Sequence, residues 1–339
     1  MKAIVLRKTG RPEVLQVTEV PDPTPGPGEV LVRLHYTGLN YAEILSRKGL
    51  YDWAPKRPYI LGMEGAGVIE AVGEGVERKV GETVVVGTQF GCYAEKIAVP
   101  EAQAVPALAH LSLEENAAFL VNYMTAWVAL LELARLQKHE KVLISAAAGG
   151  VGTAAVQLTA KLGCEVYGLA GRPEKLELVT SLGAAHALNY READCFEKVR
   201  ALSGGIDVVL ETVGGRIYKE SRKLLNPFGR LVVVGFSSFN LQKWNPVSWW
   251  RTVRDVPLVN LHKMAMASTG VMATHLGYLL KDTERMQQIF ERLRAFVSEH
   301  KIRPVVGRVF PFERAAEAHA FIESRASTGK VLLEHADAS

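Results

Sequence analysis

A glycine turn between an apolar strand and a helix sets the strictest limit on the fold of this chain. Residues Lys141–Ser145 form an apolar run, and Thr153–Leu158 have helical character. Such a turn aims backbone N–H groups and the positive end of a helix at one small volume, where glycine leaves room for an anion. A purely structural turn is the alternative. The strand before it and the helix after it favour a diphosphate site, formed by Gly149, Gly150, Val151 and Gly152.

The next apolar strand, Glu165–Ala170, ends without the acidic residue that an NAD site uses to bind the ribose hydroxyls. Arg172 and Lys175 follow instead, and cations of this kind bind a 2′-phosphate. Tyr190 follows the next short strand, and its hydroxyl is expected to close the same pocket. The alternative is that the two cations only cover a solvated helix surface. Their position at this turn favours NADPH over NADH as the cofactor.

Length and composition indicate an ordinary globular protein. The chain has 339 residues, enough for two domains, with 48% apolar and 22% charged residues. A net charge of +4 is too small to indicate a nucleic-acid partner. Three cysteines (Cys92, Cys164 and Cys195) lack the spacing of a disulfide framework or a zinc ribbon. These features predict a reducing, cytoplasmic setting.

No targeting or membrane segment is predicted. The N-terminal run Met1–Leu6 is typical of a first strand, because no signal-peptide pattern follows it. No apolar run reaches transmembrane length, so membrane insertion is not expected. Three tryptophans lie between Asn240 and Val259, a segment expected to cover a cleft or form a subunit contact and to favour a bulky, flat substrate.

The periodicity of the chain changes twice. Residues 1–117 contain short alternating strands separated by proline and glycine turns. Helical periodicity then begins at Leu113, and strands alternate with helices from Lys141. A helix is predicted over Asp282–His300, followed by a return to strand, helix and strand. This order predicts an α/β protein with a doubly wound parallel sheet. Its five predicted strands are Val142–Ser145, Val166–Ala170, Ala187–Asn189, Val208–Thr212 and Arg230–Val234.

The chain resembles the medium-chain dehydrogenase/reductase superfamily over essentially its whole length, and within it the quinone oxidoreductase branch that includes zeta-crystallin. The resemblance implies a discontinuous GroES-like catalytic domain (1–117 and 265–339) and a Rossmann NADPH-binding domain (118–264). Two segments look most like the vesicle amine transport protein homologue group, Leu120–Ala126 and His275–Leu279. The other motifs are Gly38–Glu43, Gly49–Tyr51, Gly62–Gly67, Val72–Val76, Ala146–Gly152, Asn189–Tyr190 and Gly329–Val331.

The resemblance also argues against zinc. Zinc-using relatives place cysteine and histidine ligands at motifs where this chain has Leu39, Met63 and Val121. Glu64 alone does not make a metal site. Without a Lewis acid to stabilise an alkoxide, alcohol oxidation is disfavoured. Quinones and α,β-unsaturated carbonyl compounds, which accept hydride readily, become the expected substrates.

Roles for individual residues follow only from the resemblance. It implies that Asn40 lies near the nicotinamide ribose or the substrate and that Tyr51 lines the substrate pocket. Thr125 would lie beside the nicotinamide, with Gly235 and Phe236 on its other side. A turn cap, a packed aromatic ring and a core-facing threonine are the structural alternatives for Asn40, Tyr51 and Thr125.

One departure from the family pattern concerns the acceptor. Leu45 stands where several bacterial relatives have a pocket tyrosine, which makes the pocket more apolar.

Two functions therefore compete. The first is zinc-independent, NADPH-dependent reduction of quinones or α,β-unsaturated carbonyls by hydride transfer. The second is an NADPH-binding interaction or regulatory protein with little turnover, a reading that the lack of an identified acid–base residue keeps open. The resemblance also implies a homodimer in which the last strands of two sheets pair, with residues 260–279 nearby.

Overall fold

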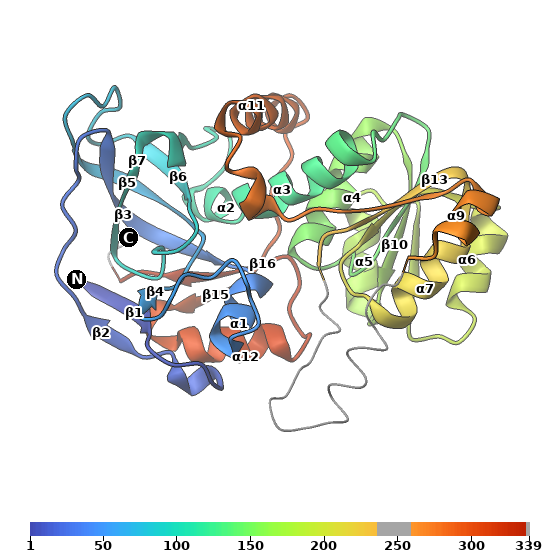
Figure 1. Ribbon diagram of the computed structural model, residues 1–339, viewed down its shortest axis with the longest axis horizontal. Coiled ribbons are helices and arrows are strands. Elements are labelled where there is room, and N and C mark those ends of the chain that lie inside the picture. Colours follow the sequence, from blue (N-terminus) through green and yellow to red (C-terminus); the bar gives the residue numbers. More distant parts are fainter. Residues whose placement is uncertain (236–258, 337–339) are drawn as a thin grey trace. The chain divides into compact units, whose positions relative to one another are not determined.

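The computed structural model describes residues 1–235 and 259–336, and the chain within them forms two compact units (Figure 1). Unit 1 contains residues 1–122 and 294–339, and unit 2 contains residues 123–293. Two helices run across these boundaries, α3 (Leu120–Trp127) and α11 (Thr283–Glu299). The N-terminal and C-terminal parts of the chain therefore fold together in unit 1.

Unit 1 is built on a seven-stranded sheet. Its strand order is β15-β16-β3-β5-β6-β8, and β7 pairs with β3. The first two strands of this order come from the end of the chain, and β16 pairs antiparallel with β3. The strands of this sheet are β3 (Glu29–Leu39), β5 (Glu64–Val72), β6 (Thr83–Gly87), β7 (Lys96–Pro100), β8 (Ala104–Pro106), β15 (Val306–Pro311) and β16 (Lys330–Glu334).

A smaller sheet of order β2-β1-β4 completes the strands described for this unit. Aromatic and aliphatic side chains of the two sheets and of the last helix share one apolar cluster, which includes Tyr93, Phe310 and Phe312. The remaining elements of unit 1 are β1 (Lys2–Leu6), β2 (Val17–Glu19), β4 (Tyr59–Ile60), α1 (Tyr41–Lys48), α2 (Leu113–Ala117) and α12 (Ala315–Glu323).

Unit 2 is built on a parallel six-stranded sheet of order β11-β10-β9-β12-β13-β14. In chain order this is third, second, first, fourth, fifth and sixth, the doubly wound arrangement of a dinucleotide-binding sheet. The predicted α/β fold class is confirmed. The strands are β9 (Lys141–Ile144), β10 (Glu165–Ala170), β11 (His186–Asn189), β12 (Ile206–Glu211), β13 (Leu225–Val233) and β14 (Gly270–Ala273).

Apolar side chains of the sheet and of two helices form one core cluster of unit 2. Phe196 and Val199 of α6 and Tyr218 of α7 pack with Leu143 and Leu169 of the strands. The central strands β9, β10 and β12 are largely buried, as a parallel sheet with covered faces requires. The helices of unit 2 besides α3 and α11 are α4 (Gly150–Leu162), α5 (Pro173–Ser181), α6 (Cys195–Ser203), α7 (Gly215–Lys223), α9 (Leu261–Ala267) and α10 (Leu276–Leu279).

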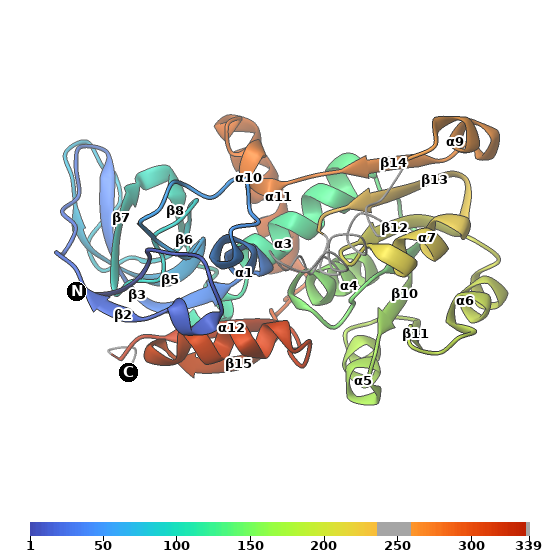
Figure 2. The same ribbon diagram turned by 60° about the horizontal axis from the view of Figure 1, so that its bottom comes forward.

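The sixth strand is the main difference from the sequence-based expectation, which had five. Strand β14 pairs in parallel with β13, and Figure 2 shows the two side by side. Residues 265–293, which the sequence placed in the GroES-like domain, therefore belong to the unit with the parallel sheet. The strand has only four residues, GVMA, and is partly buried, and an apolar run this short does not distinguish a strand from a helix segment. The tryptophan-rich segment lies outside the described residues, apart from Val259.

Unit 1 buries two histidines without opposite charges bonded to their rings. His319 is fully buried, and its Nε2 lies 2.9 Å from the Tyr93 hydroxyl oxygen. His335 is also buried, with its Nε2 3.0 Å from the Thr37 hydroxyl oxygen. Burial disfavours the imidazolium and lowers the pKa of His319 to about 3 and that of His335 to about 4. Both rings are neutral in the folded protein at neutral pH.

The pKa of His319 predicts a specific loss of stability in acid. Its folded pKa lies below the ordinary 6.5, so its contribution is complete above pH 6.5 and is lost as the pH falls towards 3. Between pH 7 and pH 5, the wild type should lose about 2 kcal/mol of unfolding free energy relative to His319→Gln. Urea denaturation at each pH measures this difference. The exposed His262, changed to Gln, is the control, and an equal shift in both variants would contradict the prediction.

Candidate functional site

The carboxyl ends of the parallel strands bring the predicted cofactor residues of unit 2 to one edge of its sheet. Ala170 at the end of β10 is in register with Asn189 at the end of β11. Ile144 at the end of β9 is in register with Gly168 of β10 and with Leu210 of β12. Across the sheet, the strand order runs back from β11 to β9 and continues with β12. Sheets of this order bind ligands at the point of reversal, between β9 and β12.

The glycine turn after β9 is closely packed. A Cβ on Gly152 would lie 2.2 Å from the carbonyl oxygen of Ala146, so only glycine fits at the start of α4. Gly149 is the residue before the helix, and Gly150 is its first residue. The first N–H groups of a helix have no partners within it, and they attract anions. The predicted stretch Gly149–Gly152 therefore begins a helix at the expected edge of the sheet.

Three cations gather where β10 and β11 end. Arg172 precedes the first turn of α5, and Lys175 lies within that turn. The pKa of Lys175 is lowered by partial burial and by the positive charges of Arg172 and Arg191. Gly171 lets the neighbouring loop approach, because a Cβ there would lie 2.9 Å from the Tyr190 hydroxyl oxygen and 3.0 Å from Arg191 Nε. Like charges placed this close together suit an anionic ligand.

Arg191 was missed by the sequence analysis. It follows Tyr190 directly and is exposed. Its position just after the end of a strand was the one sequence signal for it. Tyr190 was assigned to the cofactor pocket because it follows a strand end, and the next residue shares that position. The tertiary approach that brings Arg191 beside Gly171 had no signal in the sequence.

Polar groups also mark the ends of the central strands. The hydroxyl oxygens of Ser145 and Thr212 lie 3.3 Å apart, and the Thr212 N–H donates to Ser145 Oγ at 2.8 Å. Glu211 is buried beside them and accepts hydrogen bonds from the N–H groups of Val213 and Gly214 at 2.6 Å each. Burial raises the pKa of Glu211 to about 7. Its carboxylate closes the turn after β12.

Three further residues, Thr125, Gly235 and Phe236, were predicted to lie near the nicotinamide. Thr125 on α3 is partly exposed between the buried Met124 and Ala126. Gly235 follows β13, and its Cβ position would be 3.6 Å from the carbonyl oxygen of Thr212. Phe236 lies outside the described residues. Gly235 is thus close to the end of β12.

Asn40 and Tyr51 belong to unit 1. The Tyr51 ring stands edge-on to that of Trp53, with centroids 6.4 Å apart, and is partly exposed. Asn40 precedes α1, and its backbone N–H donates to Glu43 Oε2 at 2.6 Å, so Glu43 caps the helix. The Asn40 side chain lies in a network of charged groups.

This network is buried, and it includes Lys330. Lys330 Nζ donates to Asn40 Oδ1 at 2.7 Å and also pairs with Glu64, whose side chain is fully buried. Glu43 Oε1 accepts from Asn40 Nδ2 at 3.3 Å and from the Met63 N–H at 3.0 Å. Burial raises the pKa of Glu43 to about 7, an effect that the charge of Lys330 opposes. Asn40 is thus held by a cation at its oxygen and a carboxylate at its nitrogen.

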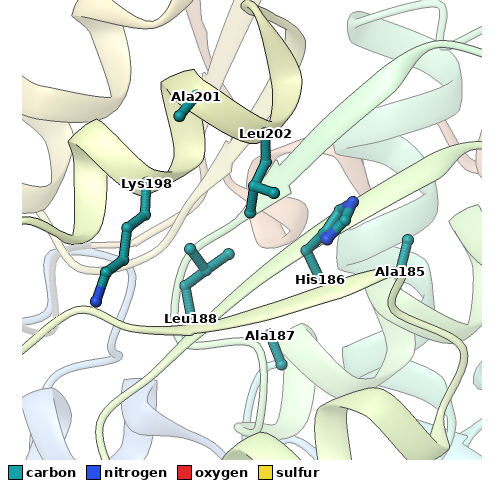
Figure 3. Close-up of a pocket in the computed structure, with 7 residues that line it drawn as sticks. All are labelled: Ala185, His186, Ala187, Leu188, Lys198, Ala201 and Leu202. Carbon is teal, nitrogen blue, oxygen red and sulfur yellow. The ribbon is translucent and has the colours of Figure 1, made fainter.

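A pocket beside β11 in unit 2 is lined by none of the predicted site residues (Figure 3). It lies between the edge strand β11 and α6, lined by His186, Leu188, Lys198 and Leu202 together with three alanines. The His186 ring stacks on Tyr167 with centroids 4.6 Å apart. The pocket is therefore separate from the candidate cofactor residues.

Comparison with known proteins finds two matching family models. A family model for the alcohol dehydrogenase GroES-like domain matches residues 26–109, and one for zinc-binding dehydrogenases matches residues 182–333. The human synaptic vesicle membrane protein VAT-1 homolog is 37% identical over 323 residues, covering 94% of this chain and 82% of that protein. Pig quinone oxidoreductase is 33% identical, covering 98% of this chain and 97% of the relative.

Among solved structures, the quinone oxidoreductase from Thermus thermophilus, also determined in complex with NADPH, has a TM-score of 0.81. It is 36% identical and covers 98% of this chain and all of its own. The fold, the two domain matches and these relatives define an oxidoreductase with a GroES-like and a Rossmann domain. The chain belongs to the medium-chain dehydrogenase/reductase superfamily and fits its quinone oxidoreductase branch.

Two observations concern metals and membranes. Within residues 1–235 and 259–336, no three histidine, cysteine, aspartate or glutamate side chains are grouped so that they could hold a metal ion. Glu64, the carboxylate of the glycine motif, is paired with Lys330. In the described part of the chain, no helix combines the length and the apolar character needed to cross a membrane.

Proposed function

We propose that this protein is an NADPH-dependent reductase of quinones or α,β-unsaturated carbonyl compounds, active in the cytoplasm. The observation that carries the proposal is the cation cluster of Arg172, Lys175 and Arg191 beside the glycine turn at Gly149–Gly152. It matches the charge of a dinucleotide with an additional phosphate. The quinone oxidoreductases among the relatives support the reaction class.

The residues of unit 2 fit the parts of NADPH. The helix start at Gly150 would hold the diphosphate, because the first N–H groups of α4 have no partners within the helix. Arg172, Lys175 and Arg191 would bind the 2′-phosphate, with the Tyr190 hydroxyl as a further donor. When bound, NADPH supplies a hydride. Thr125, Gly235 and Phe236 are proposed to position the nicotinamide.

In unit 1, Asn40 and Tyr51 are proposed to contact the acceptor or the nicotinamide ribose. Neither residue needs a metal for that role. A quinone or an enone accepts hydride because conjugation spreads the developing charge, so the protein's main task is orientation. Leu45 near Asn40 keeps the expected pocket apolar.

The first prediction tests turnover itself. Purified protein should oxidise NADPH, followed at 340 nm, with benzoquinone, a naphthoquinone, phenanthrenequinone or a 2-alkenal as acceptor. NADH should be a weak donor in parallel assays. If NADPH binds by fluorescence and no acceptor is reduced, the reductase proposal fails, and the alternative of an NADPH-binding interaction protein takes its place.

The second prediction concerns cofactor choice. Arg191→Ala removes one charged hydrogen-bond donor from the 2′-phosphate, so the KM for NADPH should rise about tenfold. The KM for NADH should change by less than about twofold, because NADH has no phosphate there. Arg285→Ala, an exposed arginine on α11, is the matched control. Equal effects on both cofactors would exclude a specific role for Arg191.

The third prediction concerns assembly. In the described part of unit 2, β14 is an edge strand, and Leu261 of the neighbouring α9 is 75% exposed. An unpaired edge with apolar neighbours is suited to pairing with a second copy, so we infer a homodimer. Light scattering after gel filtration should give twice the chain mass of 37.1 kDa. Leu261→Lys should shift the mass towards the monomer, whereas Leu202→Lys, on α6, should not. A monomeric wild type would refute the dimer.

A further inference from the structure

The side chain of Asn40 is held by both ends of its amide group. Its Oδ1 accepts from Lys330 Nζ, and one Nδ2 hydrogen is donated to Glu43 Oε1. An ammonium group only donates, and Glu43 Oε1 is an acceptor here because the Met63 N–H also donates to it. Rotating the amide by half a turn would therefore place oxygen against oxygen and nitrogen against nitrogen. The partners allow one orientation.

That orientation leaves Asn40 with one hydrogen-bond donor to offer. The second Nδ2 hydrogen has no partner among the described residues, and Asn40 is partly exposed. The oxygen of the amide is occupied by a full positive charge. Asn40 is thus set to donate to a ligand oxygen.

The fold builds this arrangement at the meeting of three strands. Val331 of β16 is in register with Leu39, so the preceding Lys330 stands beside Asn40 at the end of β3. Gly38 is in register with Glu64 of β5. A Cβ on Gly38 would lie 2.8 Å from each of Lys330 Cε, Glu64 Cγ and the Ala117 carbonyl oxygen. Glycine at this position makes the room that the ion pair needs.

Stability alone is a weak reason for this pair. The side chains of Lys330 and Glu64 are 2% and 0% exposed, so both ions lose their hydration. The attraction within such a pair often does no more than offset that loss, and apolar residues of similar volume can do as well. Glu64 is further held by the Val121 N–H, which donates to Oε2 at 2.9 Å. A role in fixing the orientation of the Asn40 amide explains why a buried lysine stands at position 330.

We propose that Lys330, anchored by Glu64, is a positioning residue that keeps Asn40 a hydrogen-bond donor towards an oxygen of the bound cofactor or acceptor. The inference rests on the proposed function for its effect on turnover. Its effect on the Asn40 amide does not depend on activity. The oxygen belongs either to a ribose hydroxyl of the cofactor or to the carbonyl of the acceptor, and both accept the same hydrogen bond.

A double-mutant cycle tests the proposal. Lys330→Met keeps an unbranched side chain one atom shorter and removes its donors. It should lower kcat/KM for the best quinone by about tenfold, as expected for the loss of one oriented hydrogen bond. In an Asn40→Ala background the same change should have almost no further effect on kcat/KM. Equal losses in both backgrounds would overturn the proposal, because a purely structural lysine acts whether or not Asn40 is present.

Two binding measurements separate the possible oxygens. If Asn40 donates to the cofactor, Asn40→Ala and Lys330→Met should both weaken NADPH binding measured by fluorescence. If it donates to the acceptor, NADPH binding should be unchanged, and kcat or the KM for the quinone should change. A change in neither would contradict a donor role for Asn40.

A spectroscopic measurement is independent of turnover. The side-chain amide signals of Asn40 in a nitrogen-15 correlation spectrum are identified by their loss in Asn40→Ala. In Lys330→Met these signals should move, because the amide loses the cation that fixes its orientation. Unchanged signals would overturn the proposal even for an active enzyme. Shifted signals in a protein without turnover would support the inference while the proposed function failed.

Glu64→Gln provides a second variant if Lys330→Met does not fold. Its remaining carbonyl oxygen can still accept from Lys330, but the anchoring charge is lost. The expected change is a smaller fall in kcat/KM that again disappears in the Asn40→Ala background. Melting temperatures of all variants establish that folded proteins are compared.

Discussion

A helix can begin directly against the end of a strand only where no side chain stands between them, and Gly152 meets that condition. A Cβ at this position would lie 2.2 Å from the carbonyl oxygen of Ala146, which is too close for two non-bonded atoms. The start of α4 is thereby fixed against the turn after β9, a strand that lies in parallel register with β10 and β12. The candidate site at the sheet edge depends on this contact, because β10 and β12 are in register with β9, the strand that leads into α4.

The same steric device recurs at two further places. Gly171 admits Tyr190 and Arg191 to the end of β10, and Gly38 admits Lys330 and Glu64 between strands of unit 1. In each case the absence of one side chain allows charged or polar groups to approach closely. The two units thus place their charged groups differently, with partly or fully exposed cations in unit 2 and a buried ion pair in unit 1.

The cation cluster of unit 2 and the Lys330–Glu64 pair of unit 1 differ in their electrostatics. Arg172, Lys175 and Arg191 repel one another, and an anionic ligand would relieve that repulsion. Lys330 is buried and already paired with Glu64, so its ammonium group is not available to bind an anionic ligand. Its positive charge instead acts on a neighbour, the Asn40 amide. The cation cluster of unit 2 thus suits an anion, whereas the ion pair of unit 1 holds a hydrogen-bond donor in place.

The sequence by itself determined the parallel sheet, the glycine turn and the first two cations. These features depend on local order along the chain, a strand followed by glycines and then a helix, and on the residues just after strand ends. The sequence also determined the superfamily, since its motifs are spread over the whole length. It did not reveal β14, because an apolar run of four residues, Gly270–Ala273, does not distinguish a strand from a helix segment.

Only the tertiary structure decided which distant residues meet. Arg191 joins Arg172 because β10 and β11 end in register, and Lys330 reaches Asn40 because the last strand returns to pair with β3. Asn40 and Lys330 are separated by 290 positions, and neither residue type announces such a contact. Strand pairing is set by the packing of whole sheets, so it lies beyond what local patterns can specify.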